Sequence, residues 1–300
     1  MCGIAGIISF ADKPCKGRAY RRALSAAIRS MENRGTDAAG LWLNDHETGK
    51  FALIKTDCKA SELARTEHWA MAVHQDFSTA FAHTRFATQG SPKDNANNHP
   101  IRSKRTGCVL VHNGCISNDA ELARELGFAR DGLVDSEAIL RTYEVLKACM
   151  KKGKLAAIKA TIKKLRGSAA FALQDGSTVF LYRGDNPCWT AWISGRNCMI
   201  FASEKFQARA AADHLKLRSQ ERRDWSQVEY REMAVGELLE FNLERKTIMS
   251  GKVAPRRDFT AGSIKEVNHW FKNQEVWPEK EVWPEKEFCE GKEYYEGGQP

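Results

Sequence analysis

The sequence predicts one large mixed α/β domain whose strands are joined mostly as hairpins. Three observations predict this class. The 300 residues are 42% hydrophobic and 28% charged, a balance typical of a globular chain. Short apolar segments alternate with amphipathic ones over the first 242 residues. Many of the short segments follow one another at hairpin spacing, which disfavours the regular strand–helix–strand order of a doubly wound sheet.

The first half of the chain predicts five strands and three helices. Arg18–Glu32 places its apolar side chains at helical spacing, so it predicts an amphipathic helix. Turn-forming residues from 44 to 49 separate two short apolar runs and predict a hairpin. Residues able to cap a helix stand before the two other helices, at 117 or 119 and at 135 or 136. These helices end at Leu126 and Cys149, and the strands are Ile4–Ser9, Gly40–Leu43, Phe51–Lys55, Thr79–Thr84 and Cys108–His112.

The second half predicts one more helix, Lys154–Leu165, and a series of strands. The strands are Ala169–Leu173, Thr178–Tyr182, Trp189–Ile193, Met199–Ala202 and Ala234–Asn242. We therefore expect a domain over residues 1–250 and a charged, Trp-containing tail over residues 251–300. In the tail, the six residues Glu275–Lys280 (EVWPEK) are repeated at once as Glu281–Lys286.

Composition also restricts the cellular setting. No apolar run approaches the roughly 18 residues that span a bilayer, and the N-terminus lacks the pattern of a signal peptide. The nine cysteines are an odd number without a C-x-x-C pair, so we expect reduced thiols in the cytoplasm and no membrane partner. The net charge is +8, and basic clusters run from Lys151 to Arg166 and from Arg218 to Arg223. Solvated helix faces explain such clusters best, and nucleic acid is the less favoured alternative.

Cys2 carries the most informative chemistry. A small second residue allows removal of Met1, and Cys2 would then hold a thiol and a free α-amine on one carbon. The thiolate is the nucleophilic form, and an α-amine with a pKa of roughly 7.7–8.0 is suited to act as its base. Such a nucleophile needs no distant histidine. The alternative is that Cys2 is only a small core residue.

Two further segments offer groups for a small ligand. The segment Ala82–Gly90 contains Arg85, whose planar fork suits a carboxylate, and Thr88 and Gln89 add polar contacts. The following loop reaches His99 and could close over a ligand. The alternatives are an ordinary surface arginine and a structural histidine. In the earlier segment Asn33–Gly40, Arg34 could pair with Asp37 or brace the nucleophile, or the segment could be only a helix-ending turn.

Two more segments supply a possible oxyanion hole and a carboxylate. Asn113-Gly114 follows an apolar strand, where such a pair is usually a turn. It could equally direct a side-chain N–H and a backbone N–H at one point, as an oxyanion hole does. Asp135 leads a helix, either as its N-cap or as the partner of a substrate ammonium. Together these groups fit a ligand with an α-carboxylate, an α-ammonium and a carbonyl open to a thiolate. Glutamine meets that description.

In order, the motifs resemble the class II glutamine amidotransferase domain, a member of the N-terminal nucleophile hydrolases. They are Met-Cys-Gly-Ile at the N-terminus, Arg-Gly-x-Asp from Arg34, His-Thr-Arg-Phe-Ala-Thr from His83, His-Asn-Gly from His112 and Asp-Ser-Glu from Asp135. The sequence is most similar to the glutaminase half of glucosamine-6-phosphate synthase, and the resemblance extends from about Cys2 to Asn242. It implies an α+β fold, a four-layer αββα sandwich in which helices cover two stacked antiparallel sheets.

The resemblance also implies a role for each matching residue. Cys2 would be the nucleophile and its α-amine the base, acting through a water. Arg34 would stabilise the Cys2 end, and Asn113 and Gly114 would form the oxyanion hole. The residues expected to bind glutamine are Arg85 and Thr88 at the α-carboxylate, Asp135 at the α-ammonium, Phe86 and Gln89 in the glutamine loop, and His99 in the covering loop. Phe86 and Gln89 stand where the sugar synthases have Trp and His. No metal or cofactor is implied.

We therefore expect a glutaminase that releases ammonia for a separate synthetase or acceptor-modifying protein. The 58 residues after Asn242 are too few for an acceptor domain of the kind the relatives carry, so we expect that domain in another chain. One alternative is a stand-alone hydrolase of a γ-glutamyl or related small amide. A catalytically silent regulatory subunit is disfavoured because Cys2, Arg85, Asn113 and Asp135 are all present.

Overall fold

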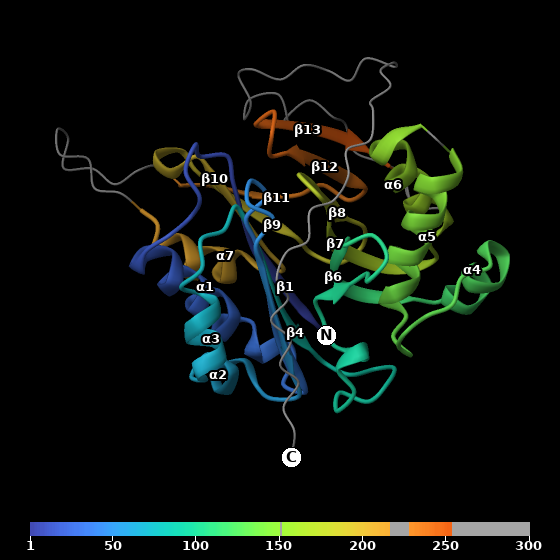
Figure 1. Ribbon diagram of the computed structural model, residues 1–300, viewed down its shortest axis with the longest axis horizontal. Coiled ribbons are helices and arrows are strands. Elements are labelled where there is room, and N and C mark those ends of the chain that lie inside the picture. Colours follow the sequence, from blue (N-terminus) through green and yellow to red (C-terminus); the bar gives the residue numbers. More distant parts are fainter. Residues whose placement is uncertain (151, 217–227, 254–300) are drawn as a thin grey trace.

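Two β-sheets stacked face to face form the centre of the protein (Figure 1). The computed structural model describes residues 1–150, 152–216 and 228–253. The first sheet has seven strands in the order β11-β9-β10-β1-β4-β2-β3, and all neighbouring strands are antiparallel. Its strands are β1 (Gly3–Ser9), β2 (Ala38–Asn44), β3 (Phe51–Thr56), β4 (Thr79–Arg85), β9 (Trp189–Ile193), β10 (Cys198–Ala202) and β11 (Val228–Glu232).

The second sheet has six strands in the order β13-β12-β8-β7-β6-β5, again all antiparallel. Its strands are β5 (Ile101–Arg102), β6 (Val109–Ile116), β7 (Gly167–Asp175), β8 (Thr178–Arg183), β12 (Glu237–Asn242) and β13 (Thr247–Lys252). The predicted hairpins form at β2–β3, β7–β8 and β9–β10, and the described strands add two more at β5–β6 and β12–β13.

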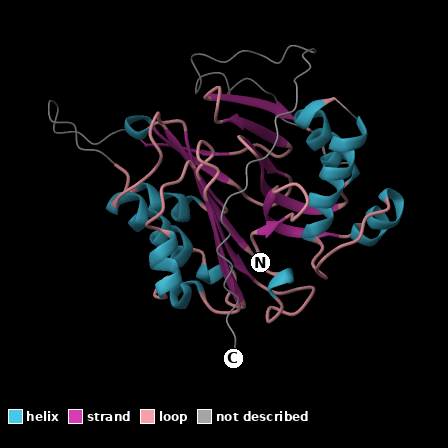
Figure 2. Ribbon diagram, viewed as in Figure 1, coloured by secondary structure: helices cyan, strands magenta, loops and turns pink. Residues whose placement is uncertain are grey.

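Helices cover the outer face of each sheet, so the described chain has four layers (Figures 1 and 2). The helices on the first sheet are α1 (Arg18–Ser30), α2 (Ala60–Leu63), α3 (Glu67–Ala72) and α7 (Lys205–Ala212). Those on the second sheet are α4 (Asp119–Leu126), α5 (Ser136–Met150) and α6 (Gly153–Lys164). Short 3₁₀ turns lie at Glu32–Arg34, Asn95–Asn97 and Ser194–Arg196. The predicted αββα sandwich is confirmed.

Three hydrophobic clusters join the layers. One lies between the first sheet and its helices and includes Leu24, Ile28 and Trp69. A second lies between the other sheet and α5 and α6, and a third fills the space between the two sheets. Alternation along β1 explains this division, because Ala5 and Ile7 face the helices while Ile4 and Ile8 face the other sheet.

Several elements differ from the sequence-based expectation. The pair Asn113-Gly114 is not a turn, because β6 continues through it to Ile116 and pairs with β7 along its whole length. The helix α7 and the strands β11 and β13 were not predicted, nor were α2, α3 and β5. Strand β13 carries the described fold to Lys252.

The described residues hold no helix that is both long and apolar enough to cross a membrane. Their eight cysteines are all free thiols. The charged chain from residue 254 onward, with its EVWPEK repeat, and the whole basic cluster Arg218–Arg223 lie outside the described residues.

Candidate active site

Cys2 lies at the start of β1, next to the end of β4. Strand β1 pairs with β4 in the register Gly3↔Thr84, so the residue before Gly3 lies beside Arg85. The half-buried Cys2 thiol is 3.6 Å from the Phe86 carbonyl oxygen and donates to it. Burial raises the pKa of this thiol, an effect that the nearby Arg85 guanidinium partly offsets and the Asp135 carboxylate reinforces. A neutral thiol needs a base before it can act as a nucleophile.

Arg34 and Asn113 hold the backbone of Cys2. Arg34 Nε donates to the Cys2 carbonyl oxygen at 2.9 Å. With its amide oriented to satisfy both neighbours, Asn113 Nδ2 lies 3.0 Å from the same oxygen and Oδ1 lies 3.3 Å from Arg34 Nη2. Of the contacts left open by the sequence, Arg34 therefore makes the one to the Cys2 end rather than the one to Asp37.

Glu204 is a member of this site that the sequence analysis missed. Its carboxylate Oε1 pairs with Arg34 Nη1 in a close ion pair, and the Arg34 side chain is only 8% exposed. Glu204 also precedes α7 and closes a capping box with Gln207. The neighbouring Ser203 hydroxyl accepts from the backbone N–H of Ile4 at 3.0 Å. The start of α7 thus supports both the brace on Cys2 and the first strand. The sequence signal was a Glu-x-x-Gln spacing directly after an apolar strand.

Asp37 and Gly35 fix the turn that follows β4. Asp37 Oδ2 accepts from the Ala87 N–H at 2.7 Å, and the Asp37 N–H donates to the Arg85 carbonyl oxygen at 3.0 Å. A Cβ atom on Gly35 would lie 2.4 Å from the Arg85 carbonyl carbon, so only glycine permits this approach. The Arg-Gly-x-Asp motif therefore positions the segment that carries Arg85.

Arg85 is 2% exposed and is surrounded by its own loop. Nη1 donates to Asn98 Oδ1 at 2.9 Å, and Nη2 donates to the carbonyl oxygens of Gly90, at 2.9 Å, and Gln89. The fork of the guanidinium thus holds loop 89–98 closed in this structure. A ligand carboxylate would reach it by taking the place of these oxygen atoms.

Asp135 lies directly before α5, and its charge acts on the Cys2 thiol. It is 3% exposed, and its Oδ2 accepts from the backbone N–H of Ile116 at 2.5 Å. The other carboxylate oxygen, Oδ1, is left for a cation. In β6, Gly114 has φ +153°, and a Cβ there would lie 2.0 Å from the Ser168 carbonyl oxygen. This crowding requires glycine beside Asn113.

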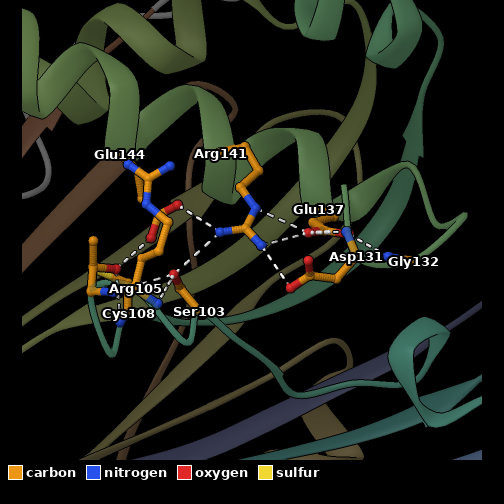
Figure 3. A network of polar contacts seen from close by, with 9 residues as sticks. Ser103, Arg105, Cys108, Asp131, Gly132, Glu137, Arg141 and Glu144 are labelled. Atoms are coloured by element: carbon orange, nitrogen blue, oxygen red, sulfur yellow. Dashed lines mark hydrogen bonds and ion pairs between the residues drawn. The ribbon is translucent and has the colours of Figure 1, made fainter. Parts of the chain in front are cut away.

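A buried polar network supports the start of α5 (Figure 3). Arg141 donates to Glu137 Oε1 at 3.0 Å, Glu144 Oε2 at 3.1 Å, Asp131 Oδ2 at 2.9 Å and Ser103 Oγ at 3.3 Å. Glu137 also accepts the backbone N–H groups of residues 131 and 132, each at 2.9 Å.

This network reaches the Arg85 loop through one further contact. The Leu133 N–H donates to Asn97 Oδ1 at 2.7 Å, and Asn97 lies in the loop that surrounds Arg85. The segment before Asp135 and the loop over Arg85 are therefore fixed to each other.

His99, which the resemblance places in the covering loop, is a buried residue. It is 3% exposed, and its ring stacks on His83 with centroids 4.2 Å apart. Neither ring nitrogen of His99 has a hydrogen-bond partner among the described residues. His83 Nε2 donates to the His112 carbonyl oxygen at 3.0 Å, so the stacked pair lies between the sheets. By contrast Phe86, Thr88 and Gln89 are exposed, as expected of residues that line an entrance.

We expect the buried histidines to make the fold sensitive to acid. Burial lowers the pKa of His83 to about 3 and the pKa of His99 well below its usual value. Below about pH 6.5 the unfolded chain binds protons that the folded chain does not, so stability is lost as pH falls. For each of these two histidines, the free energy of unfolding should fall by about 2 kcal/mol as the pH drops from 6.5 to 5.

Urea unfolding at pH 7.5 and 5.0 measures this loss. His99→Phe keeps a ring on His83 without a titrating group and should flatten the pH dependence, whereas His68→Gln, at an exposed histidine, should not. Equal pH dependence in His99→Phe and the wild type would contradict the assignment.

Comparison with known proteins agrees with this geometry. A family model described as a glutamine amidotransferase domain matches residues 83–209. Glutamine–fructose-6-phosphate aminotransferase of Streptococcus pneumoniae serotype 4 is 30% identical over 229 residues, covering 74% of this chain and 35% of that protein. The enzyme of the same name from Bacteroides thetaiotaomicron is 32% identical over 179 residues, covering 58% of this chain and 27% of that protein. The chain thus spans about a third of the length of these relatives.

A solved structure shares the fold. Glutamine phosphoribosylpyrophosphate amidotransferase from B. subtilis superposes with a TM-score of 0.64 over 84% of this chain and 49% of that chain, at 20% identity. The stacked antiparallel sheets, with a cysteine at the start of an inner strand, define an N-terminal nucleophile hydrolase fold. Within that class, this chain carries a class II glutamine amidotransferase domain.

Proposed function

We propose that this protein hydrolyses the side-chain amide of glutamine and releases ammonia for a separate acceptor enzyme. The observation that supports it is the convergence on Cys2 of groups from distant parts of the chain. Arg34 and Asn113 contact the Cys2 backbone, and the charges of Arg85 and Asp135 act on its thiol. A cation and an anion that both act on one nucleophile match the α-carboxylate and α-ammonium of an amino acid.

The proposed reaction begins once Met1 has been removed. The Cys2 α-amine takes the thiol proton, through a water, and the thiolate attacks the amide carbon of glutamine. The resulting oxyanion accepts from a second N–H of Asn113 Nδ2 and from the Gly114 N–H. The protonated α-amine of Cys2 then gives this proton to the leaving nitrogen, and the C–N bond breaks to give ammonia and a glutamyl thioester. Water, activated by the same amine, hydrolyses the thioester to glutamate.

In the same proposal the substrate is held at its two charged ends. Its α-carboxylate displaces loop oxygens from Arg85, and its α-ammonium binds the free oxygen of Asp135. Thr88, Phe86 and Gln89 line the entrance. His99 supports the loop from beneath, through its stacking on His83.

The ammonia acceptor is proposed to lie on another protein or domain. The domain's relatives are named for transfer to fructose-6-phosphate, and this chain covers only 35% of the Streptococcus pneumoniae serotype 4 enzyme. A stand-alone hydrolase of another small amide would need no acceptor, but no observation favours that activity over the hydrolysis of glutamine for an acceptor. Co-purification of the native protein, followed by assays for amidation of captured partners, tests this part.

Covalent trapping provides the central test. Full-length protein is incubated with a glutamine analogue that bears an electrophilic diazoketone, and the intact mass and N-terminal peptide are measured. We expect loss of Met1 and one adduct on Cys2, with excess glutamine protecting the thiol. Active protein that retains Met1 would overturn the role of the α-amine, and an adduct on another cysteine would overturn the site.

Arg85→Lys should impair glutamine recognition strongly. A lysine ammonium is a point charge and cannot reproduce the fork that meets a carboxylate or the loop oxygens. We expect kcat/KM for glutamine to fall by a factor that corresponds to about 2–5 kcal/mol. Steady-state kinetics measure the change, and Arg124→Lys on the exposed face of α4 is the control. Near-normal kcat/KM would show that the carboxylate binds elsewhere.

Glu204→Gln should slow turnover more than it weakens binding. The change removes the negative charge that holds Arg34 on the Cys2 carbonyl, so the nucleophile loses its fixed position. We expect kcat to fall about tenfold while KM stays within about twofold. Glu204→Asp should restore part of kcat, and Glu232→Gln, which breaks a remote surface pair with Arg183, should change neither constant. A rise in KM alone would contradict a positioning role for Glu204.

A further inference from the structure

A row of arginines follows the outer side of α1, away from the hydrophobic cluster. Arg18, Arg22 and Arg29 are exposed and Arg21 is half-buried, whereas Leu24 and Ile28 on the opposite side are buried. At a rise of 1.5 Å per residue, the row extends over about 16 Å.

These arginines line a hollow of about 540 Å³. Its other walls include His74, just after α3, and His214, just after α7. The two helices flank α1 on the outer layer (Figure 1). His74 Nδ1 contacts the Ala70 carbonyl oxygen, so its Nε2 is left for a ligand. A concave site of this volume is in the range of small-molecule pockets.

The positive charge of the hollow is not compensated within the described residues. The side chains of Arg18, Arg21 and Arg22 form no hydrogen bond or ion pair there, and Arg29 donates only to the Ala64 carbonyl oxygen, at 3.3 Å. The first turn of α1 contains no acidic residue. Cations in a first turn, and like charges three or four residues apart, both disfavour a helix. The arrangement therefore lowers the intrinsic stability of α1, which is expected of a binding site.

We propose that this hollow binds a small ligand with two or more adjacent phosphate groups. Guanidinium forks match phosphate oxygens bidentately, and several forks in a row suit neighbouring phosphates. The described lining contains arginine, histidine, serine and alanine, and it lacks the Phe, Tyr or Trp rings on which successive bases of a strand most often stack. Its concave shape and limited volume favour a compact phosphate chain over a nucleic-acid strand.

The test compares binding of three probes to the full-length protein by calorimetry at low salt. The probes are tripolyphosphate, ATP and a single-stranded oligonucleotide. We expect tripolyphosphate and ATP to bind with similar affinity and a stoichiometry of one, and to weaken as salt rises because the contacts are ionic. The variant Arg18→Gln/Arg22→Gln/Arg29→Gln should bind at least about a hundredfold more weakly.

A second triple variant controls for net charge. Arg105→Gln/Arg124→Gln/Arg245→Gln removes the same charge elsewhere and should bind both phosphates normally. Both variants should keep wild-type glutamine hydrolysis, because none of the six arginines belongs to the proposed active site. Absence of saturable binding, or equal weakening by both triple variants, would overturn the proposal. Tighter binding of the oligonucleotide through the same arginines would overturn it in favour of a nucleic-acid surface.

Discussion

Cys2→Ala should abolish hydrolysis of glutamine, with kcat reduced by at least about 10⁴-fold. The change removes the only atom proposed to bond to the amide carbon, and no other described thiol lies beside Arg34, Asn113 and Arg85. A coupled assay for glutamate measures the rate, and thermal unfolding confirms that the variant is folded. Activity above about a tenth of wild type would place the nucleophile elsewhere.

Two other cysteines serve as matched controls for Cys2→Ala. Cys115 is exposed at the end of β6, and Cys58 is half-buried after β3. Burial raises the pKa of both thiols, and no cation pairs with either one in the part of the chain that the structure describes. Cys115→Ala and Cys58→Ala should therefore keep most of the activity. Loss of activity in either one, with Cys2 intact, would contradict the assignment of the nucleophile.

Arg141→Met should destabilise the fold by about 3–5 kcal/mol. The side chains of Glu137 and Glu144 are 2% and 3% exposed, so removing the guanidinium leaves two buried carboxylates without their cation. Urea unfolding measures the loss, which corresponds to roughly 10 °C in Tm for a domain of this size. Because unpaired buried carboxylates take up protons, the gap between variant and wild type should narrow as pH falls.

A surface pair provides the comparison for Arg141→Met. Arg166 pairs with Glu121 at 3.0 Å, and both side chains are about half exposed. Arg166→Met should cost less than about 1 kcal/mol, since water screens such a pair. Similar losses of unfolding free energy in the two variants would show that the network around Arg141 stabilises the fold no more than a surface ion pair does.

Where apolar periodicity determines an element, the sequence was sufficient to predict it. Helix α1 and the strands β1, β4, β7 and β8 lie within one to three residues of the expected bounds at each end. The elements that were missed lack that signal. Helix α7 buries the polar Gln207 with its alanines, and strand β11 alternates without strong apolar residues. Strand β13 contains Gly251 and gains its place only by pairing with β12.

The residues of the candidate site also divide into those that the sequence could predict and those that it could not. Cys2, Arg85, Asn113 and Asp135 could be proposed from motifs, because each residue type matches a group on the ligand. The partners that position them could not. Glu204 is 170 residues from Arg34, and nothing in the sequence around Arg141 marks it as the centre of a cluster of carboxylates. Burial of His99 depends on the stacking of one loop against β4, which no local pattern encodes.

The pairing of β1 with β10 has a consequence for protein synthesis. Residues of the first strand leave the ribosome at once, but their partners from Cys198 to Ala202 emerge about 200 residues later. Glu204, which holds the brace on Cys2, follows still later. A nascent chain can therefore lose its first methionine long before it can hold the thiol in position. Premature termination anywhere before β10 would leave β1 with an open edge, and incomplete copies would lack the proposed active site.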